Sequence, residues 1–140
     1  MTEFAKTMQS LKSAGLFNGI DGRILYNDVI SVNHVIPKHS YRPFKQKECF
    51  SNAVKLLEKI KRNDAWYCEG YVSVNNSTPI EHAWVIVGYT IIDPTFEVAL
   101  NIPVDKINKE EYYLLKKYTL TEVYEKLLKY RKYGPWWNKN

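Results

Sequence analysis

Apolar residues recur at helical spacing in residues 48–62, which read ECFSNAVKLLEKIKR. One stripe along this segment is formed by Phe50, Ala53, Val54, Leu57 and Ile60. The remaining positions, which are expected to face solvent, include Ser51, Lys55, Glu58, Lys59 and Arg62. This periodicity predicts an amphipathic helix whose first turn holds Cys49.

Three shorter segments after this helix predict an antiparallel sheet. Residues 66–74 (WYCEGYVSV), 80–87 (IEHAWVIV) and 90–93 (TIID) are rich in aromatic and β-branched side chains. The turn-rich residues 75–79 (NNSTP) and the pair Gly88-Tyr89 separate them. We therefore predict a meander of three antiparallel strands.

The N-terminal part is expected to supply a further helix and short strands. Residues 2–14 begin with a threonine that can cap a helix and end before Gly15, a residue that favours helix ends. Residues 23–36 are β-rich enough for one or two short strands, and residues 37–47 contain two prolines and are predicted to form a loop.

The C-terminal part is expected to be helical over about residues 105–134. Thr119 and Glu122 have the spacing of a capping box, and Gly134-Pro135 is expected to end the helix. Residues 108–118 (NKEEYYLLKKY) are compatible with either a helix or a strand. The many tyrosine and tryptophan side chains of this part are expected to pack on the core.

The chain length of 140 residues fits one α+β domain spanning residues 1–140. Hydrophobic residues at 45% and charged residues at 25% are typical of a folded globular protein and exclude disorder over most of the chain. Neither a long apolar run nor a signal peptide is visible. We therefore expect a cytoplasmic protein that does not partner with a membrane.

The net charge of +5 raises the question of nucleic-acid binding. The basic residues alternate with glutamates and apolar residues on predicted helices, as they do on solvated helix faces. Nucleic acid is therefore disfavoured as a partner. With two cysteines, three histidines and no Cys-x-x-Cys pair, the chain also offers no ligand set for a zinc site, so no metal or cofactor is expected.

The hairpin that reads HAWVIVGYTIID places a histidine and an aspartate at its two ends. If Gly88-Tyr89 is a two-residue turn, Trp84 faces Asp93, and His82 lies on the same face as both. His82 and Asp93 are then diagonal neighbours within reach of one hydrogen bond. A three-residue turn would instead put Asp93 on the opposite face.

A histidine oriented by a carboxylate can act as the general base for a thiol. Cys49 is the candidate thiol because the first turn of a helix favours the thiolate through its dipole and its free N–H groups. Residues 41–48 contain no Ser, Thr, Asp or Asn that would cap those N–H groups, which leaves them open for an oxyanion. Cys68, inside a predicted strand, is expected to be a buried small hydrophobe.

The order of CFSNAVKLL, EGYVSV, HAW and DPT resembles the transglutaminase-like branch of the papain-like cysteine enzymes. The resemblance covers about residues 44–97, and the spacings of 33 from Cys49 to His82 and 11 from His82 to Asp93 are similar to small bacterial and viral members. It implies a papain-like core in which a nucleophile helix packs on an antiparallel sheet.

The resemblance also implies a reaction. Cys49 would be the nucleophile, His82 the general base and acid, and Asp93 the residue that orients His82, with acyl transfer through a thioester and no cofactor. Gln46 resembles the glutamine that helps to form the oxyanion hole, although the papain spacing is longer. The expected substrate is a protein, a peptide or another amide, and the enzyme would be a hydrolase or an acyltransferase.

Two residues beside this constellation are expected to border the cleft and to bind substrate, Trp84 and Glu69. Alternative interpretations remain open at this point. Asp93 before Pro94 also suits a simple turn residue, and Glu69 also suits a strand-edge charge or a partner of Arg42. A catalytically silent triad fold would serve as a binding or inhibitory module.

Overall fold

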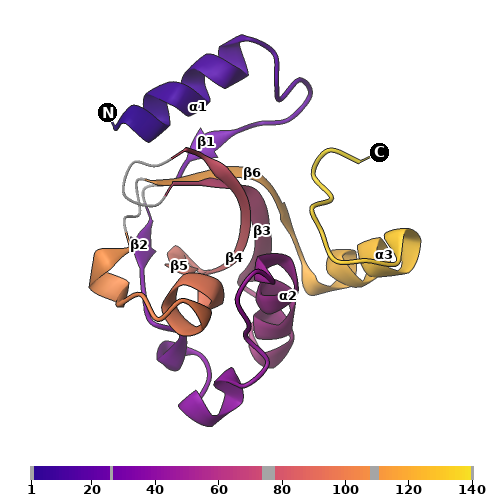
Figure 1. The fold of residues 1–140 in the computed structure, drawn as a ribbon. Coiled ribbons are helices and arrows are strands. Elements are labelled where there is room, and N and C mark those ends of the chain that lie inside the picture. The colour runs from indigo at the N-terminus through magenta and orange to yellow at the C-terminus, as the bar shows by residue number, and fades with distance from the viewer. Residues whose placement is uncertain (1, 26, 74–77, 108–110, 140) are drawn as a thin grey trace.

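A computed structural model describes residues 2–25, 27–73, 78–107 and 111–139, and within these stretches six strands form one curled sheet (Figure 1). The strands are β1 (Arg23–Ile24), β2 (Asp28–Val29), β3 (Ala65–Val72), β4 (Ile80–Val87), β5 (Thr90–Ile92) and β6 (Tyr112–Tyr118). Their order is β1-β6-β3-β4-β5-β2, which puts β3 and β4 at the centre. Neighbouring strands run antiparallel except β2 and β5, which are parallel.

Helices surround this sheet, so the expected mixed α+β fold is confirmed. The α-helices are α1 (Glu3–Ser13), α2 (Cys49–Lys59) and α3 (Leu120–Tyr130). Short 3₁₀ turns are η1 (Val32–His34), η2 (Lys38–Tyr41) and η4 (Val104–Lys106), and a π-helical turn forms η3 (Thr95–Ala99). In Figure 1, α2 lies against the curled sheet, α1 lies beyond β1, and α3 lies beside α2. None of the helices described is long and apolar enough to cross a membrane.

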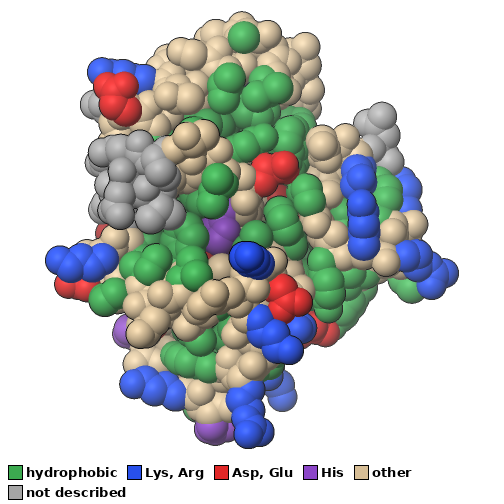
Figure 2. Space-filling view, viewed as in Figure 1, with side chains coloured by type: hydrophobic (Ala, Val, Ile, Leu, Met, Phe, Trp, Pro, Cys, Tyr) green, Lys and Arg blue, Asp and Glu red, His purple; other side chains and the backbone are tan. Residues whose placement is uncertain are grey.

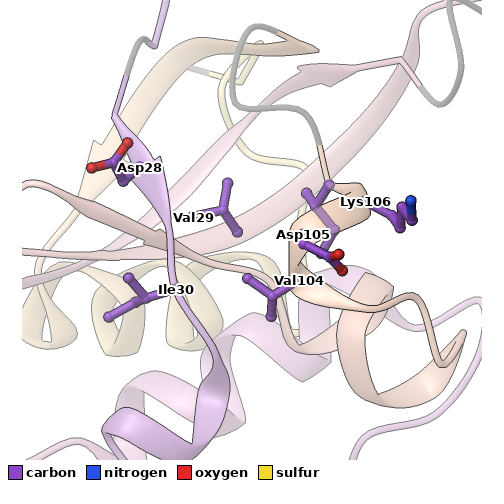
Figure 3. A pocket seen from close by; sticks show the side chains of 7 residues that line it. Asp28, Val29, Ile30, Val104, Asp105 and Lys106 are labelled. Atoms are coloured by element: carbon purple, nitrogen blue, oxygen red, sulfur yellow. The ribbon is translucent and has the colours of Figure 1, made fainter.

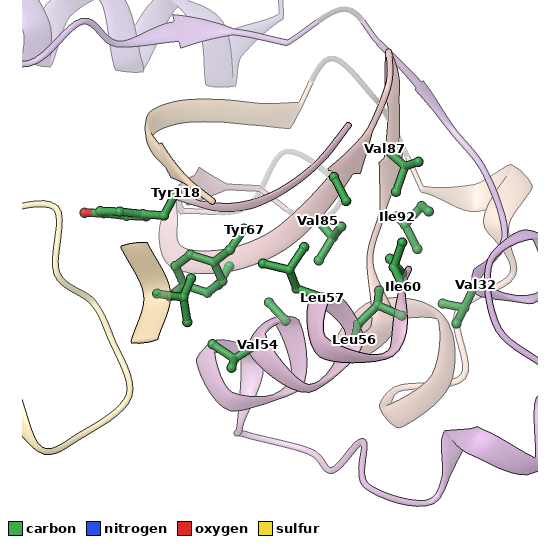
Figure 4. Packing of buried hydrophobic residues seen from close by; sticks show 14 of the residues in the cluster. Val32, Val54, Leu56, Leu57, Ile60, Tyr67, Val85, Val87, Ile92 and Tyr118 are labelled. Carbon is green, nitrogen blue, oxygen red and sulfur yellow. The ribbon is translucent and has the colours of Figure 1, made fainter. Parts of the chain in front are cut away.

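The amphipathic helix predicted from the apolar stripe is α2. Figure 4 shows Val54, Leu56, Leu57 and Ile60 pointing toward the strand residues Tyr67, Val85 and Ile92. The helix ends at Lys59, three residues before the predicted end. The expectation that Ser51 faces solvent was wrong: it is 7% exposed, and its hydroxyl donates to the Glu48 carbonyl within the first turn.

The predicted meander consists of β3, β4 and β5, and the predicted hairpin register is confirmed. Val87 is opposite Thr90, and Val85 is opposite Ile92. Gly88 has φ +60°, a conformation that the turn needs and that glycine adopts without strain. The turn expected at residues 75–79 falls mostly on residues 74–77, which lie outside the described residues.

The C-terminal part differs from the expected helix over residues 105–134 because residues 112–118 form the strand β6. The four apolar residues 112–115 alternate between two hydrophobic clusters, one containing Trp84 and the other residues of α1. Burial on both faces explains why this run showed no clear strand alternation. Residues 108–110 lie outside the described stretches.

α3 begins with the predicted capping box, in which Thr119 and Glu122 each bond the other's backbone N–H. The helix ends at Tyr130, where Arg131 adopts the left-handed conformation, before Gly134-Pro135 is reached. The N-terminal helix is also confirmed: Thr2 Oγ1 accepts from the Ala5 N–H.

Candidate active site

His82 and Asp93 form the hydrogen bond that the hairpin register predicted. His82 Nε2 donates to Asp93 Oδ2 at 2.7 Å. The two residues are 2% and 1% exposed, so the pair is shielded from water. The register therefore brings an imidazole and a carboxylate together inside the protein, where their interaction is stronger than at the surface.

Asp93 accepts two further hydrogen bonds from residues outside the hairpin. The Tyr112 hydroxyl donates to Oδ2 at 2.6 Å, and the Phe96 N–H donates to Oδ1 at 2.9 Å. Asp93 also starts the turn η3, because the Glu97 N–H donates to its carbonyl. The alternative of a turn residue is thus correct for the backbone of Asp93, while its side chain holds His82. Three donors fix the carboxylate in one orientation.

Tyr112 was not predicted as a site residue, because it lies in residues 108–118, whose sequence is compatible with either a helix or a strand.

Replacing Tyr112 by phenylalanine removes one donor to a buried carboxylate, and we expect the free energy of unfolding to fall by about 1–3 kcal/mol. Tyr113→Phe is a matched control, since the Tyr113 hydroxyl is buried and has no hydrogen-bond partner among the described residues. Urea unfolding should show a loss for Tyr112→Phe and none for Tyr113→Phe; equal losses would contradict this role of Tyr112.

The His82 ring is held between aromatic side chains. It stacks on Phe96 with ring centroids 4.4 Å apart and lies 6.1 Å from Trp84, in both cases tilted by 21°. Burial lowers the pKa of His82, but the charge and hydrogen bond of Asp93, and then those of Cys49, raise it to about 9. The ring is therefore mainly an imidazolium at neutral pH.

Cys49 is the first residue of α2, and within the described part of the chain no side chain caps this end of the helix, as the sequence predicted. The Cys49 side chain lies close enough to the imidazole ring to contribute to the raised pKa of His82. Because Nε2 is bonded to Asp93, the ring nitrogen that remains for Cys49 is Nδ1. The thiol, the imidazole and the carboxylate thus follow one another in series.

Cys68 is a structural thiol, as expected. It is fully buried, it lies in the same cluster as Trp84, and burial raises its pKa. Cys49 is partly exposed, and both cysteines are free. The two thiols therefore differ in access and in surroundings.

Asn52 joins the two segments that carry Cys49 and Asp93. Its Nδ2 donates to the Lys45 carbonyl at 2.7 Å and to Thr95 Oγ1 at 2.9 Å, and its Oδ1 accepts from the Lys45 N–H at 3.0 Å. The loop before α2 and the turn after Asp93 are thereby held together. The sequence shows an asparagine one turn after Cys49, but it does not show that this residue is buried or which groups it bonds.

Gln46 is exposed and donates from Nε2 to the Ala99 carbonyl at 3.3 Å. This bond also joins the loop before α2 to the end of η3. The structure gives Gln46 no described contact with Cys49, so its part in an oxyanion hole stays a prediction.

Trp84 and Glu69, which were expected to border a cleft, are both fully buried. Trp84 is 0% exposed and packs edge-on against Tyr112 behind His82. Glu69 is also 0% exposed, and its partners are Tyr67 and the backbone of Trp136 and Trp137 rather than Arg42. Strand alternation predicts on which face of the sheet each residue lies. It does not predict which other segments of the chain cover that face.

Figure 2 shows hydrophobic side chains across the middle of one face, between α1 and α2, with lysines and arginines around the edge and also beside the histidine near the middle. A pocket between β2 and η4 (Figure 3) includes neither Cys49 nor Cys68 in its lining. It is lined by Asp28, Val29, Ile30, Val104, Asp105, Lys106 and Ile107. Among the residues described, no group of three or more His, Cys, Asp or Glu side chains is arranged to hold a metal ion.

Comparison of the chain with protein-family models, with curated proteins and with solved structures finds no match.

Proposed function

We propose that the chain is a cysteine hydrolase or acyltransferase with a papain-like core of the transglutaminase-like branch. The observation that carries this proposal is the series Cys49–His82–Asp93, built from the start of α2, from β4 and from the residue that follows β5. Its order and its ring-nitrogen usage suit a thiol nucleophile served by an oriented histidine. The substrate class is an amide or a similar acyl bond of a protein, peptide or smaller molecule.

In the first half of the reaction, the Cys49 thiolate attacks the carbonyl carbon of the substrate. The C–S bond forms while the π electrons move to the carbonyl oxygen. The oxyanion then collapses, the C–N bond breaks, and the His82 imidazolium gives its proton to the departing amine. A thioester on Cys49 and a neutral His82 result.

In the second half, His82 removes a proton from water or from an acceptor amine as that molecule attacks the thioester. The new C–O or C–N bond forms, the C–S bond breaks, and the thiolate returns beside the imidazolium. The Asp93 carboxylate orients His82 and stabilises the imidazolium in the resting state. Water as the acceptor gives hydrolysis, and an amine gives acyl transfer.

The start of α2 provides donors for the transient oxyanion. No side chain among the described residues caps the helix there, and the first N–H groups of a helix point outward with the positive end of its dipole. Cys49 is itself the first helical residue, so its own N–H is beside the reacting sulfur. Free thiols suit a reducing compartment such as the cytoplasm.

Limited alkylation with iodoacetamide at pH 6.5, with the modified site mapped by mass spectrometry, tests this proposal. We expect Cys49 to react at least about tenfold faster than in His82→Gln, because glutamine can occupy the site without supplying an imidazolium. Cys68 should remain unmodified in both folded proteins. Similar rates at Cys49 in the two proteins would contradict an activated thiol and would favour a silent binding or inhibitory module.

A further inference from the structure

The C-terminal segment after α3 turns back toward the sheet beside the candidate site (Figure 1). Trp136 is 1% exposed and packs against Tyr67 and Tyr118, with ring centroids 5.3 and 5.8 Å away. Trp137 packs against Phe17 and Tyr71. The segment is therefore held on the body of the protein by two tryptophan side chains.

Glu69 fastens the middle of this segment. The N–H groups of Trp136 and Trp137 both donate to Glu69 Oε1 at 2.8 Å, and the Tyr67 hydroxyl donates to Oε2 at 2.6 Å. Because Glu69 is fully buried, its carboxylate depends on these donors. Gly134 passes so close to Oε2 that an added Cβ would collide with it. The chain thus provides both the acceptor and the space that the segment needs.

The two ends of the segment lie beside the chain neighbours of the proposed catalytic residues. A Cβ on Gly134 would lie 3.2 Å from the ring of Phe50, the residue after Cys49. Trp137 Nε1 donates to Glu81 Oε2 at 2.8 Å, and Glu81 is the residue before His82. Residues 134–137 therefore bridge the start of α2 and the start of β4.

We propose that Glu69 is a positioning residue, which sets the relative placement of Cys49 and His82 by fixing residues 134–137 against both of their elements. This inference rests on the proposed function. It gives Glu69 a part in the site without contact with substrate, in place of the cleft position expected from the sequence. Small displacements of a nucleophile from its base lower rates strongly, so a brace across the two elements affects reactivity.

Comparison of Glu69→Leu with the conservative variant Glu69→Gln tests the positioning role of Glu69. Leucine leaves the buried N–H of Trp136 and the partly buried N–H of Trp137 without an acceptor, whereas glutamine keeps Oε1 for both. We expect alkylation of Cys49 at pH 6.5 to fall about tenfold in Glu69→Leu and to stay within about twofold of the wild-type rate in Glu69→Gln. Trypsin should cleave faster after Lys132 in the leucine variant as the segment detaches.

Two further variants keep the test decisive. Val87→Ala removes core volume at the turn end of β4, five residues from His82, so it should lower the melting temperature without changing the Cys49 rate. Trp137→Phe keeps an aromatic ring against Phe17 and Tyr71 but removes the bond to Glu81. Should Glu69→Leu not fold, Trp137→Phe is expected to lower the Cys49 rate by about threefold.

Two results would contradict the positioning role of Glu69. In one, residues 134–137 detach in the folded Glu69→Leu protein and Cys49 still reacts at the wild-type rate. In the other, Trp137→Phe, which lacks the bond to Glu81, also leaves that rate unchanged. The ratio of the Cys49 alkylation rates in wild type and His82→Gln separates this failure from failure of the proposed function. A large ratio, together with unchanged rates in Glu69→Leu and Trp137→Phe, would contradict only the positioning role of Glu69. A ratio near one overturns the function on which it rests.

Discussion

Replacement of Asp93 by asparagine is expected to lower the free energy of unfolding by about 3–5 kcal/mol, as for other broken buried ion pairs. Three donors converge on the Asp93 carboxylate, from His82, Tyr112 and the Phe96 backbone. Asparagine has one acceptor oxygen, so its amide group must face a donor. The His82 imidazolium also loses its counter-charge. Urea unfolding at pH 7 measures the loss.

Asp64→Asn is the matched control for this prediction. Asp64 pairs with Arg62 at 2.7 Å on the surface, where water replaces a lost ion-pair partner. The urea midpoint of this variant is therefore expected to stay close to that of the wild type. Equal losses for the two variants would show that the buried position of Asp93 adds nothing, and would contradict the geometry described for it.

The stability of the protein is expected to fall as the pH rises through about 9, because folding raises the pKa of His82 to about 9. In the unfolded chain a histidine has a pKa near 6.5. The folded state therefore binds the proton more tightly, and this stabilisation is complete below about pH 6.5 and lost above the folded pKa. The difference in pKa corresponds to about 3 kcal/mol.

Urea unfolding at intervals between pH 6 and pH 10 measures this loss, and His82→Gln isolates it. A glutamine amide donates to Asp93 without titrating, so the variant keeps the hydrogen bond and loses the proton linkage. Lysines and tyrosines titrate in both proteins and cancel in the difference. A difference that stays constant across the pH range would contradict an imidazolium in the folded protein.

The helix and hairpin of the site were predictable because their signals are local. The apolar stripe of residues 50–60 determines which face of α2 is buried. The pair Gly88-Tyr89 allows a two-residue turn, and the register of that turn brings His82 and Asp93 onto one face. Neither inference needed knowledge of any other segment.

The rest of the site depends on contacts between segments far apart in the sequence. Tyr112 reaches Asp93 only because β6 pairs with β3, and the apolar run of residues 112–115 is equally compatible with a helix. Glu69 is buried because residues 134–137 cover it. A glutamate between aromatic residues reads as a surface charge unless that cover is known.

Reaction with p-nitrophenyl acetate is the measurement that tests the central claim most directly, since it asks whether Cys49 takes up and passes on an acyl group. We predict release of p-nitrophenolate with one acetyl group bound as a thioester at Cys49, followed by discharge to water or to an added amine. The thioester should be absent in Cys49→Ala and should form much more slowly in His82→Gln. Acetylation confined to lysines, or equal rates in wild type and His82→Gln, would contradict the account.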